Sequence, residues 1–332
     1  MVQGASRFNR EAAAPVCAVA EDTVNYSSII ALACSVVLGG LSACRPSAGR
    51  PTPTGNPRRI VDAPRRPKPE QIIAWTELSF QRAIFYKPRE DSMTGLEMTF
   101  APLIVQEVAD GDATAPNSFG ALVAVDGSRA RIDSEKPTLY ATTVTMGING
   151  ADHEQVVYVW RYPAVDRGGR SISREGRGVR ITLGQDGSPL VWEALSTDTR
   201  TTVLFIAESL EQAARREFGD PLPGRRFSIE RAADEAPDVV VARIIDDGPV
   251  PMGPYVYLNA PPSRAVTTVL CRCSPSQVEA FIETRYYDLV PLKTMDPSSG
   301  GLMRWAGTLV YSELLQPVTG KSLDRILRWP RM

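Results

Sequence analysis

The stretch Thr138–Tyr162, TLYATTVTMGINGADHEQVVYVWRY, decides the fold of this chain of 332 residues. Its two halves, Thr138–Met146 and Glu154–Tyr162, are rich in the β-branched and aromatic residues that favour strands. Between them lies Asn149-Gly150, a dipeptide that supplies the positive φ angles required by a tight hairpin turn. The stretch therefore predicts an antiparallel β-hairpin.

A second hairpin is predicted downstream. Val179–Leu183 alternates apolar and polar residues and leads through Asp186-Gly187 into Leu190–Leu195. Asp-Gly is the second dipeptide that favours a tight hairpin turn. Because successive side chains of a strand point to opposite faces, we expect the apolar residues of the first strand to face inward. Arg180 and Thr182 should then face outward.

Other segments have the composition of single strands. They are Phe100–Val108, Phe119–Val125, Val203–Ile206, Val239–Ile245, Tyr255–Leu258 and Val266–Leu270. Phe119–Val125 is apolar on both faces, which is typical of a central strand.

Helical patterns are fewer. Glu208–Phe218 predicts an amphipathic helix ended by Gly219. Ser274 and Pro275 are typical of a helix start, so we expect a helix after them. Its buried stripe would be Val278, Phe281, Ile282 and Tyr286. Weaker helical patterns occur at Glu70–Tyr86, Met303–Leu315 and Ser322–Trp329. Together these elements predict an α+β fold: a largely antiparallel sheet with hairpins and a few amphipathic helices.

The part of the chain before these elements has a different composition. Ile29–Leu41 is apolar apart from Ser35, a run of thirteen residues. A membrane-spanning helix needs about 20 apolar residues, so this run is typical of a signal-peptide core instead. Arg45–Pro69 then holds seven prolines, which favour an extended tether. The sequence thus predicts a signal peptide at 1–43, a tether at 44–69 and a globular α+β domain at 70–332.

The apolar run ends in Leu41-Ser42-Ala43-Cys44, and the segment Ser28–Cys44 resembles the targeting segment of bacterial lipoprotein precursors. The resemblance implies that residues 1–43 are removed and that the Cys44 sulfur carries a diacylglyceryl group. Two acyl chains anchor a soluble domain stably, so we expect the membrane to be a partner through this anchor. The alternative is a buried hydrophobic helix followed by an ordinary cysteine.

The resemblance also predicts the compartment, which is the cell envelope. Arg45 follows the cysteine, where inner-membrane lipoproteins often carry aspartate. In a Gram-negative organism this is similar to sorting to the outer membrane or to its periplasmic face. An envelope protein or polymer is then the class of partner that the location suggests. The formal net charge of −1 gives no reason to expect a nucleic-acid partner, and no motif predicts a cofactor.

Three groups of residues are candidates for chemistry. Cys271 and Cys273 flank one arginine at the end of a predicted strand, where they could form a redox pair or half of a soft-metal site, or two inert thiols. Asp152-His153-Glu154 follows the Asn-Gly turn, and adjacent residues of a strand diverge, so we interpret it as a solvated hairpin edge. The glycine-rich stretch 167–178 could cradle an anion, or be an ordinary exposed loop. Its arginines are Arg167, Arg170, Arg174 and Arg177.

These observations favour a lipid-anchored envelope protein whose domain binds a partner or gives structural support. The alternative is an exported thiol-redox or metal-binding protein that uses Cys271 and Cys273. Neither the GxSxG elbow nor the HExxH helix occurs in the sequence, and catalytic residues that meet only in space leave no such motif. The sequence therefore leaves open whether the protein is an enzyme.

Overall fold

The computed structural model describes residues 68–108, 118–126, 129–163, 176–196, 201–248, 253–260, 265–270, 277–292 and 323–331. The predicted signal peptide, Cys44 and nearly all of the predicted tether lie outside this part of the chain. In the described part 51% of the residues are in strands and 14% in helices, so the fold is mostly β.

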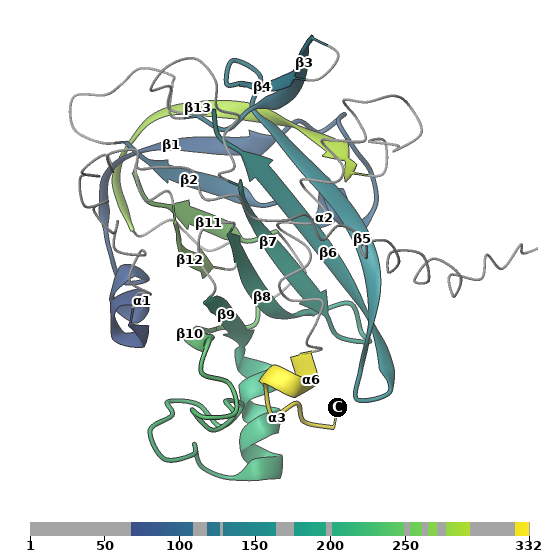
Figure 1. The fold of residues 1–332 in the computed structure, drawn as a ribbon, viewed down its shortest axis with the longest axis vertical. Helices are drawn as coiled ribbons and strands as arrows, with labels where there is room; N and C mark the ends of the chain where they lie inside the picture. The colour runs from purple at the N-terminus through teal and green to yellow at the C-terminus, as the bar shows by residue number, and fades with distance from the viewer. Residues whose placement is uncertain are drawn as a thin grey trace, which may run out of the picture. The chain divides into compact units, whose positions relative to one another are not determined.

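One large sheet of eleven strands organises the molecule (Figure 1). Its order is β10-β9-β8-β7-β6-β5-β13-β1-β2-β11-β12, and it curls until it is nearly closed. The strands are β1 (Phe80–Pro88), β2 (Leu103–Glu107), β5 (Thr138–Ile148), β6 (Ala151–Arg161), β7 (Gly176–Leu183), β8 (Pro189–Ser196), β9 (Thr202–Ala207), β10 (Val239–Ile245), β11 (Tyr255–Leu258), β12 (Val266–Leu270) and β13 (Val278–Pro291).

The strand directions correct the expected α+β fold with a largely antiparallel sheet. Six of the ten pairings between these described strands are antiparallel, and four are parallel. Three of the parallel pairs join strands far apart in the sequence, such as β13 with β1 and with β5, and the fourth joins β9 and β10 on either side of α3. Local turn signals predict hairpins but carry no information about such pairings, and the sheet is therefore mixed.

Both predicted hairpins are confirmed, with one difference in the turns. Between β5 and β6, Asn149 and Gly150 have φ of 50° and 82°, as a tight two-residue turn requires. Between β7 and β8 the connection runs from Gly184 to Ser188, and Gly187 alone takes a positive φ, 79°. The Asp-Gly signal therefore marks a hairpin here, but with a longer loop.

The sheet encloses an aromatic core around Phe119. The centroid of the Phe119 ring lies 4.7 Å from that of the Tyr86 ring on β1, 6.3 Å from that of Trp160 on β6 and 6.4 Å from that of Tyr287 on β13. The hydroxyl groups of Tyr86 and Ser118 share a hydrogen bond of 2.7 Å, which satisfies both inside the core. Phe119 thus touches strands from both halves of the curved sheet.

Phe119 precedes β3 (Ala121–Asp126), and the expectation of a central strand there is wrong. β3 pairs with β4 (Arg129–Asp133) in a separate two-stranded ribbon, at the top of Figure 1. The apolar composition of this segment reflects the burial of Phe119 at its start, because the side chains of 121–123 are only half-buried.

The helix predicted after Ser274 and Pro275 is also wrong over its described part. Residues 278–291 form β13, a strand that pairs in parallel with β1. Phe281, Ile282 and Tyr286 of the expected buried stripe are exposed. Apolar residues at these spacings fit a helix, but β-branched and aromatic residues equally fit a strand. The long pairing with β1 therefore explains why residues 278–291 form a strand and not a helix.

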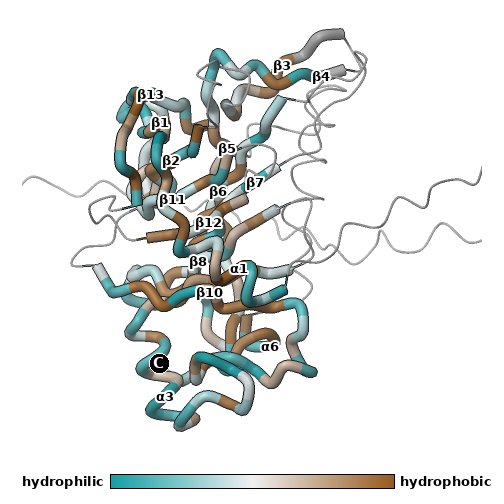
Figure 2. Tube along the Cα trace, turned by 90° about the vertical axis from the view of Figure 1, so that its left-hand side faces the viewer, coloured by the Kyte–Doolittle hydropathy of each residue, from teal (hydrophilic) through white to brown (hydrophobic). Residues whose placement is uncertain are grey.

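Short helices flank the sheet. They are α1 (Pro69–Trp75), α2 (Leu96–Thr99), α3 (Glu208–Phe218) and α6 (Leu323–Ile326). The predicted amphipathic helix is confirmed as α3, which buries Leu210 and Ala214 and is followed by Gly219 with φ of 79°. In Figure 2 the α3 region is largely hydrophilic, whereas the strands carry most of the hydrophobic residues. The ambiguous segment Glu70–Tyr86 divides into α1 and β1.

The expectation that Arg180 and Thr182 face solvent is wrong, because both faces of β7 are buried. Arg180 lies 3.3 Å from Glu193 on β8, with both side chains 3% exposed. The Thr182 hydroxyl accepts a hydrogen bond from the Gln155 side-chain amide. The alternating pattern therefore hides a polar layer inside the structure, in which an ion pair is held away from water.

We expect Arg180→Met to destabilise the protein by about 3–5 kcal/mol at neutral pH, since it leaves a buried carboxylate without its cation. Burial raises the pKa of Glu193, and Arg180 opposes this rise. Without Arg180, the pKa of Glu193 in the folded state rises further above its value in the unfolded state. The variant therefore keeps its stability below the ordinary carboxyl pKa, where Glu193 is protonated in both states, and loses it as the pH rises through the raised pKa. Urea unfolding at acidic and neutral pH measures this difference.

The control is Arg180→Met combined with Glu193→Leu, which removes both charges and should recover most of the lost stability. If the double variant is as unstable as the single one, the loss comes from packing and the ion-pair argument is wrong.

Candidate functional site

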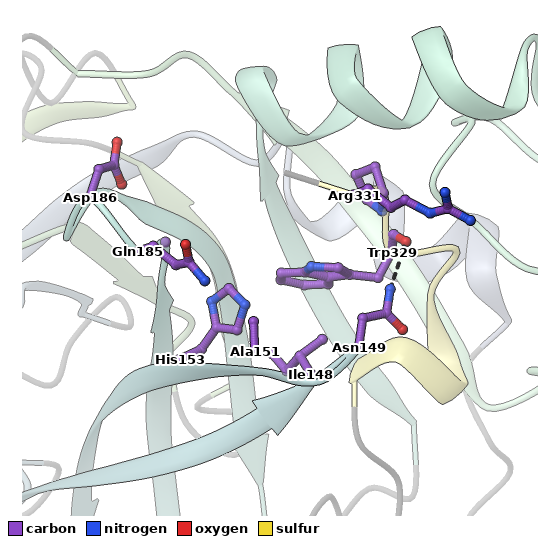
Figure 3. Close-up of a pocket in the computed structure, with 10 residues that line it drawn as sticks. Ile148, Asn149, Ala151, His153, Gln185, Asp186, Trp329 and Arg331 are labelled. Atoms are coloured by element: carbon purple, nitrogen blue, oxygen red, sulfur yellow. Dashed lines mark hydrogen bonds between the residues drawn. The ribbon is translucent and has the colours of Figure 1, made fainter.

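A pocket of about 350 Å³ lies where the β5–β6 turn, the β7–β8 loop and residues 329–331 meet (Figure 3). Its lining residues are Ile148, Asn149, Ala151, His153, Gly184, Gln185, Asp186, Trp329, Pro330 and Arg331. Ligand pockets of proteins commonly have volumes of about 300–1,000 Å³ and mostly apolar walls with a few polar groups. This pocket has that size and composition.

The hairpin turn supplies one wall. Asn149 adopts the left-handed conformation that the tight turn needs, and its side-chain amide donates a hydrogen bond of 3.1 Å to the Trp329 carbonyl. The dashed line in Figure 3 marks this bond. The same residue thus turns the hairpin and holds the chain near its C-terminal end against it.

His153 supplies the main polar group. Its ring is buried, and Nδ1 lies 2.8 Å from the Leu183 carbonyl oxygen. A carbonyl oxygen only accepts, so Nδ1 carries a hydrogen and Nε2 of the neutral ring is an acceptor. The imidazole meets the Trp329 ring edge to face at 5.5 Å. Figure 3 shows the two rings beside each other.

The interpretation of Asp152-His153-Glu154 as a solvated edge is therefore half right. Asp152 and Glu154 are exposed, and His153 points to the opposite, buried face. The three side chains diverge as the strand alternation predicts. Sequence reasoning flagged His153 but assigned it to solvent.

Besides the packing of Trp329, hydrogen bonds to the backbone of residues 323–331 hold this segment in place. Arg231 donates to the carbonyl oxygens of Asp324 and Leu327, at 2.7 and 3.1 Å. The Arg328 amide donates to the Ile229 carbonyl at 2.7 Å, and its guanidinium lies over the Phe218 ring of α3. The Trp329 wall is therefore a fixed part of the structure.

The ionisable side chains among the described lining residues are His153, Asp186 and Arg331. The Asp186 carboxylate accepts hydrogen bonds from the Ser188 amide and hydroxyl, and the Arg331 side chain is 94% exposed. In the described residues no three His, Cys, Asp or Glu side chains gather as a metal site would require.

Most of the predicted site residues lie outside the described part of the chain. These are Cys44, Arg167, Arg170, Arg174, Cys271 and Cys273. Arg177 is described: it lies buried on β7, and its guanidinium donates to the Gly176 carbonyl at 3.0 Å. Next to it, a Cβ on Gly178 would lie 2.4 Å from the Tyr158 carbonyl oxygen. The end of the glycine-rich stretch is therefore a strand in close contact with β6.

No family model, curated protein or solved structure matches the chain. Among the residues that the structure describes, no helix has the length and hydrophobicity needed to cross a membrane.

We expect Trp329→Ala to destabilise the protein by about 3–5 kcal/mol, because it removes a buried aromatic ring from the contact with His153. Residues 323–331 should also become sensitive to limited proteolysis. Trp75→Ala is the matched control, since Trp75 is 37% exposed on α1. Similar losses of stability for the two variants would show that Trp329 does not anchor this segment.

Proposed function

We propose that the protein is a lipid-anchored component of the cell envelope, and that its β-rich domain binds a ligand or partner there. The observation that carries the proposal is the tetrapeptide Leu41-Ser42-Ala43-Cys44 directly after an apolar run of thirteen residues. This arrangement places a cysteine where a lipoprotein precursor is cleaved and acylated.

The physical role of the anchor follows from the chain after Cys44. Two acyl chains on one sulfur hold a protein stably at a membrane, whereas one chain gives only marginal binding. Twenty-five residues, Arg45–Pro69, follow the cysteine and hold seven prolines. In polyproline geometry such a segment extends by about 3.1 Å per residue, and would hold the domain several nanometres from the lipid.

The pocket at His153 and Trp329 supports a binding role for the domain. It offers an aromatic wall, a buried imidazole whose Nε2 can accept a hydrogen bond, and the apolar side chains of Ile148, Ala151 and Pro330. A small ligand with an apolar ring and one hydrogen-bond donor matches these walls. An envelope protein or polymer that presents such a group is the partner class that we propose.

Expression in a bacterium with radiolabelled palmitate tests the anchor. The wild-type chain should incorporate label and have Cys44 as its first residue by mass spectrometry. Cys44→Ser should lose the label and retain residues 1–43, because the sulfur that would carry the diacylglyceryl group is gone. Cys34→Ser, in the same apolar run, is the matched control and should be labelled normally. An unlabelled wild-type chain that retains residues 1–43 would contradict the proposal.

The second candidate function is thiol-redox or metal chemistry, which the spacing Cys271-Arg272-Cys273 favours. One residue separates the two cysteines in the sequence, and they directly follow Leu270, the last residue of β12. If this function holds, purified protein should show two thiols that react faster than those of a denatured sample, or one metal ion per chain by elemental analysis. Loss of either signal in Cys271→Ser would assign it. Slow thiols without metal would exclude this function.

A further inference from the structure

The first two-thirds of β13 form an open edge of the sheet. β13 pairs with β1 from Val278 to Tyr287, but it pairs with β5 only from Asp288 to Pro291. Over 278–287, β1 is its only partner among the described strands. Among the described strands, none but β1 pairs with residues 282–286, so this stretch of β13 is an edge at which a further strand could be added. In Figure 1 this part of β13 runs along the top rim of the sheet.

The side chains of this edge are exposed and partly apolar. Five large apolar side chains are exposed in the described part of the chain, and three of them, Phe281, Ile282 and Tyr286, lie here. The pairing with β1 shifts by one residue between Ala83 and Ile84, which leaves Ile282 without an opposite residue. Edge strands are usually protected by charged side chains, lysine above all, by proline, by a β-bulge or by very short length, and β13 carries the bulge at Ile282 and the charges of Glu283 and Arg285. β13 has fourteen residues, no lysine, and its single proline, Pro291, is the last of them.

We propose that this edge pairs with the same edge of a second copy of the chain, as two antiparallel strands related by a twofold axis that passes midway between the two Thr284 residues. A twofold interface must be complementary to itself, because the same surface is present on both copies: if residue i contacts residue j of the other copy, then residue j also contacts residue i of the other copy. The five residues Ile282–Tyr286, Ile-Glu-Thr-Arg-Tyr, meet this condition in one register.

In that register each pair is favourable. Glu283 of one copy lies opposite Arg285 of the other, and the twofold axis repeats this pair of opposite charges. Ile282 lies opposite Tyr286, which joins a β-branched and an aromatic side chain, and Thr284 lies opposite Thr284. Cross-strand pairs of these three kinds each stabilise a sheet by a few tenths of a kcal/mol to about 1 kcal/mol. The pairing is limited to residues 281–287, because β5 already pairs with β13 from Asp288 onward, so residues 278–280 of each copy must diverge from the edge of the other.

The charges that form this pair are already aligned within one copy. Arg285 forms an ion pair with Glu283 and donates a hydrogen bond of 3.0 Å to the Ser118 hydroxyl. Its guanidinium is thus fixed between the Glu283 carboxylate and the buried Ser118 hydroxyl. The second copy would add a further carboxylate to a cation that is already in position.

Disulfide trapping tests the register. The experiment uses the full chain with Cys44→Ser, so that no acyl chains are attached; the apolar run Ile29–Leu41 is the same in every variant and cannot cause a difference between them. Thr284→Cys should give a disulfide-linked dimer on mild oxidation, because opposite residues of paired strands lie about 5 Å apart. Ile282→Cys is the matched control. Its two copies would be offset by four residues, about 14 Å, which is beyond the reach of a disulfide. Mass spectrometry of the linked peptide identifies the bond among the native cysteines.

Sedimentation over a dilution series tests the edge itself. The chain should reach twice the mass of one copy, 36.2 kDa, at high concentration. Ile282→Lys should return it to the mass of one copy, since it places a charge opposite Tyr286 on an exposed position. Leu78→Lys, at another exposed apolar position, should leave the dimer unchanged.

A dimer that Ile282→Lys abolishes, together with cross-linking at 284 and not at 282, would support the proposal. A single-copy mass at every concentration would overturn it, and so would equal cross-linking at the two positions. In the first case an extended segment of a different protein would become the occupant to test at this edge.

Discussion

The contacts of Phe119 unite the two halves of the sheet. One half consists of six strands in sequence order, β5 to β10, and the other of β13, β1, β2, β11 and β12, whose order in the sheet differs from their order in the sequence. The Phe119 ring touches Tyr86 and Tyr287 on the second half and Trp160 on the first. A sheet that curls must fill its interior, and interiors are packed as densely as organic crystals. Phe119 and its aromatic neighbours fill this one.

The local elements of the fold could be predicted from the sequence, and the arrangement of the sheet could not. Asn149-Gly150 and the helix before Gly219 depend on residues near in sequence, whose backbone preferences act wherever they occur. The parallel pairing of β13 with β1 joins residues about 200 positions apart, and no turn residue signals it. The expected helix at 278–286 failed for this reason, since apolar spacing alone fits two kinds of element.

The candidate site divides in the same way. His153 stood out as the single histidine, next to a turn that was correctly predicted. The burial of its ring depends on Trp329, which comes from a segment that the sequence marked only as a weak helical pattern. The polar layer of Arg180 and Glu193 was missed because strand alternation gives the two faces of a strand but not which of them is covered. Side chains that work together here come from distant parts of the chain.

The hydrogen bond between Asn149 and Trp329 has a kinetic consequence. It joins residues 180 positions apart, so the two ends of a long chain segment must be brought together before this hydrogen bond can stabilise the structure. Closing a longer loop costs more entropy, and contacts of high sequence separation are slow to form. We expect the hairpins to form early, because their contacts are local, and the Trp329 side chain to pack only after the strands between Asn149 and Trp329 have formed. We therefore expect the pocket to be completed late in folding, when Trp329 joins the wall formed by the β5–β6 turn.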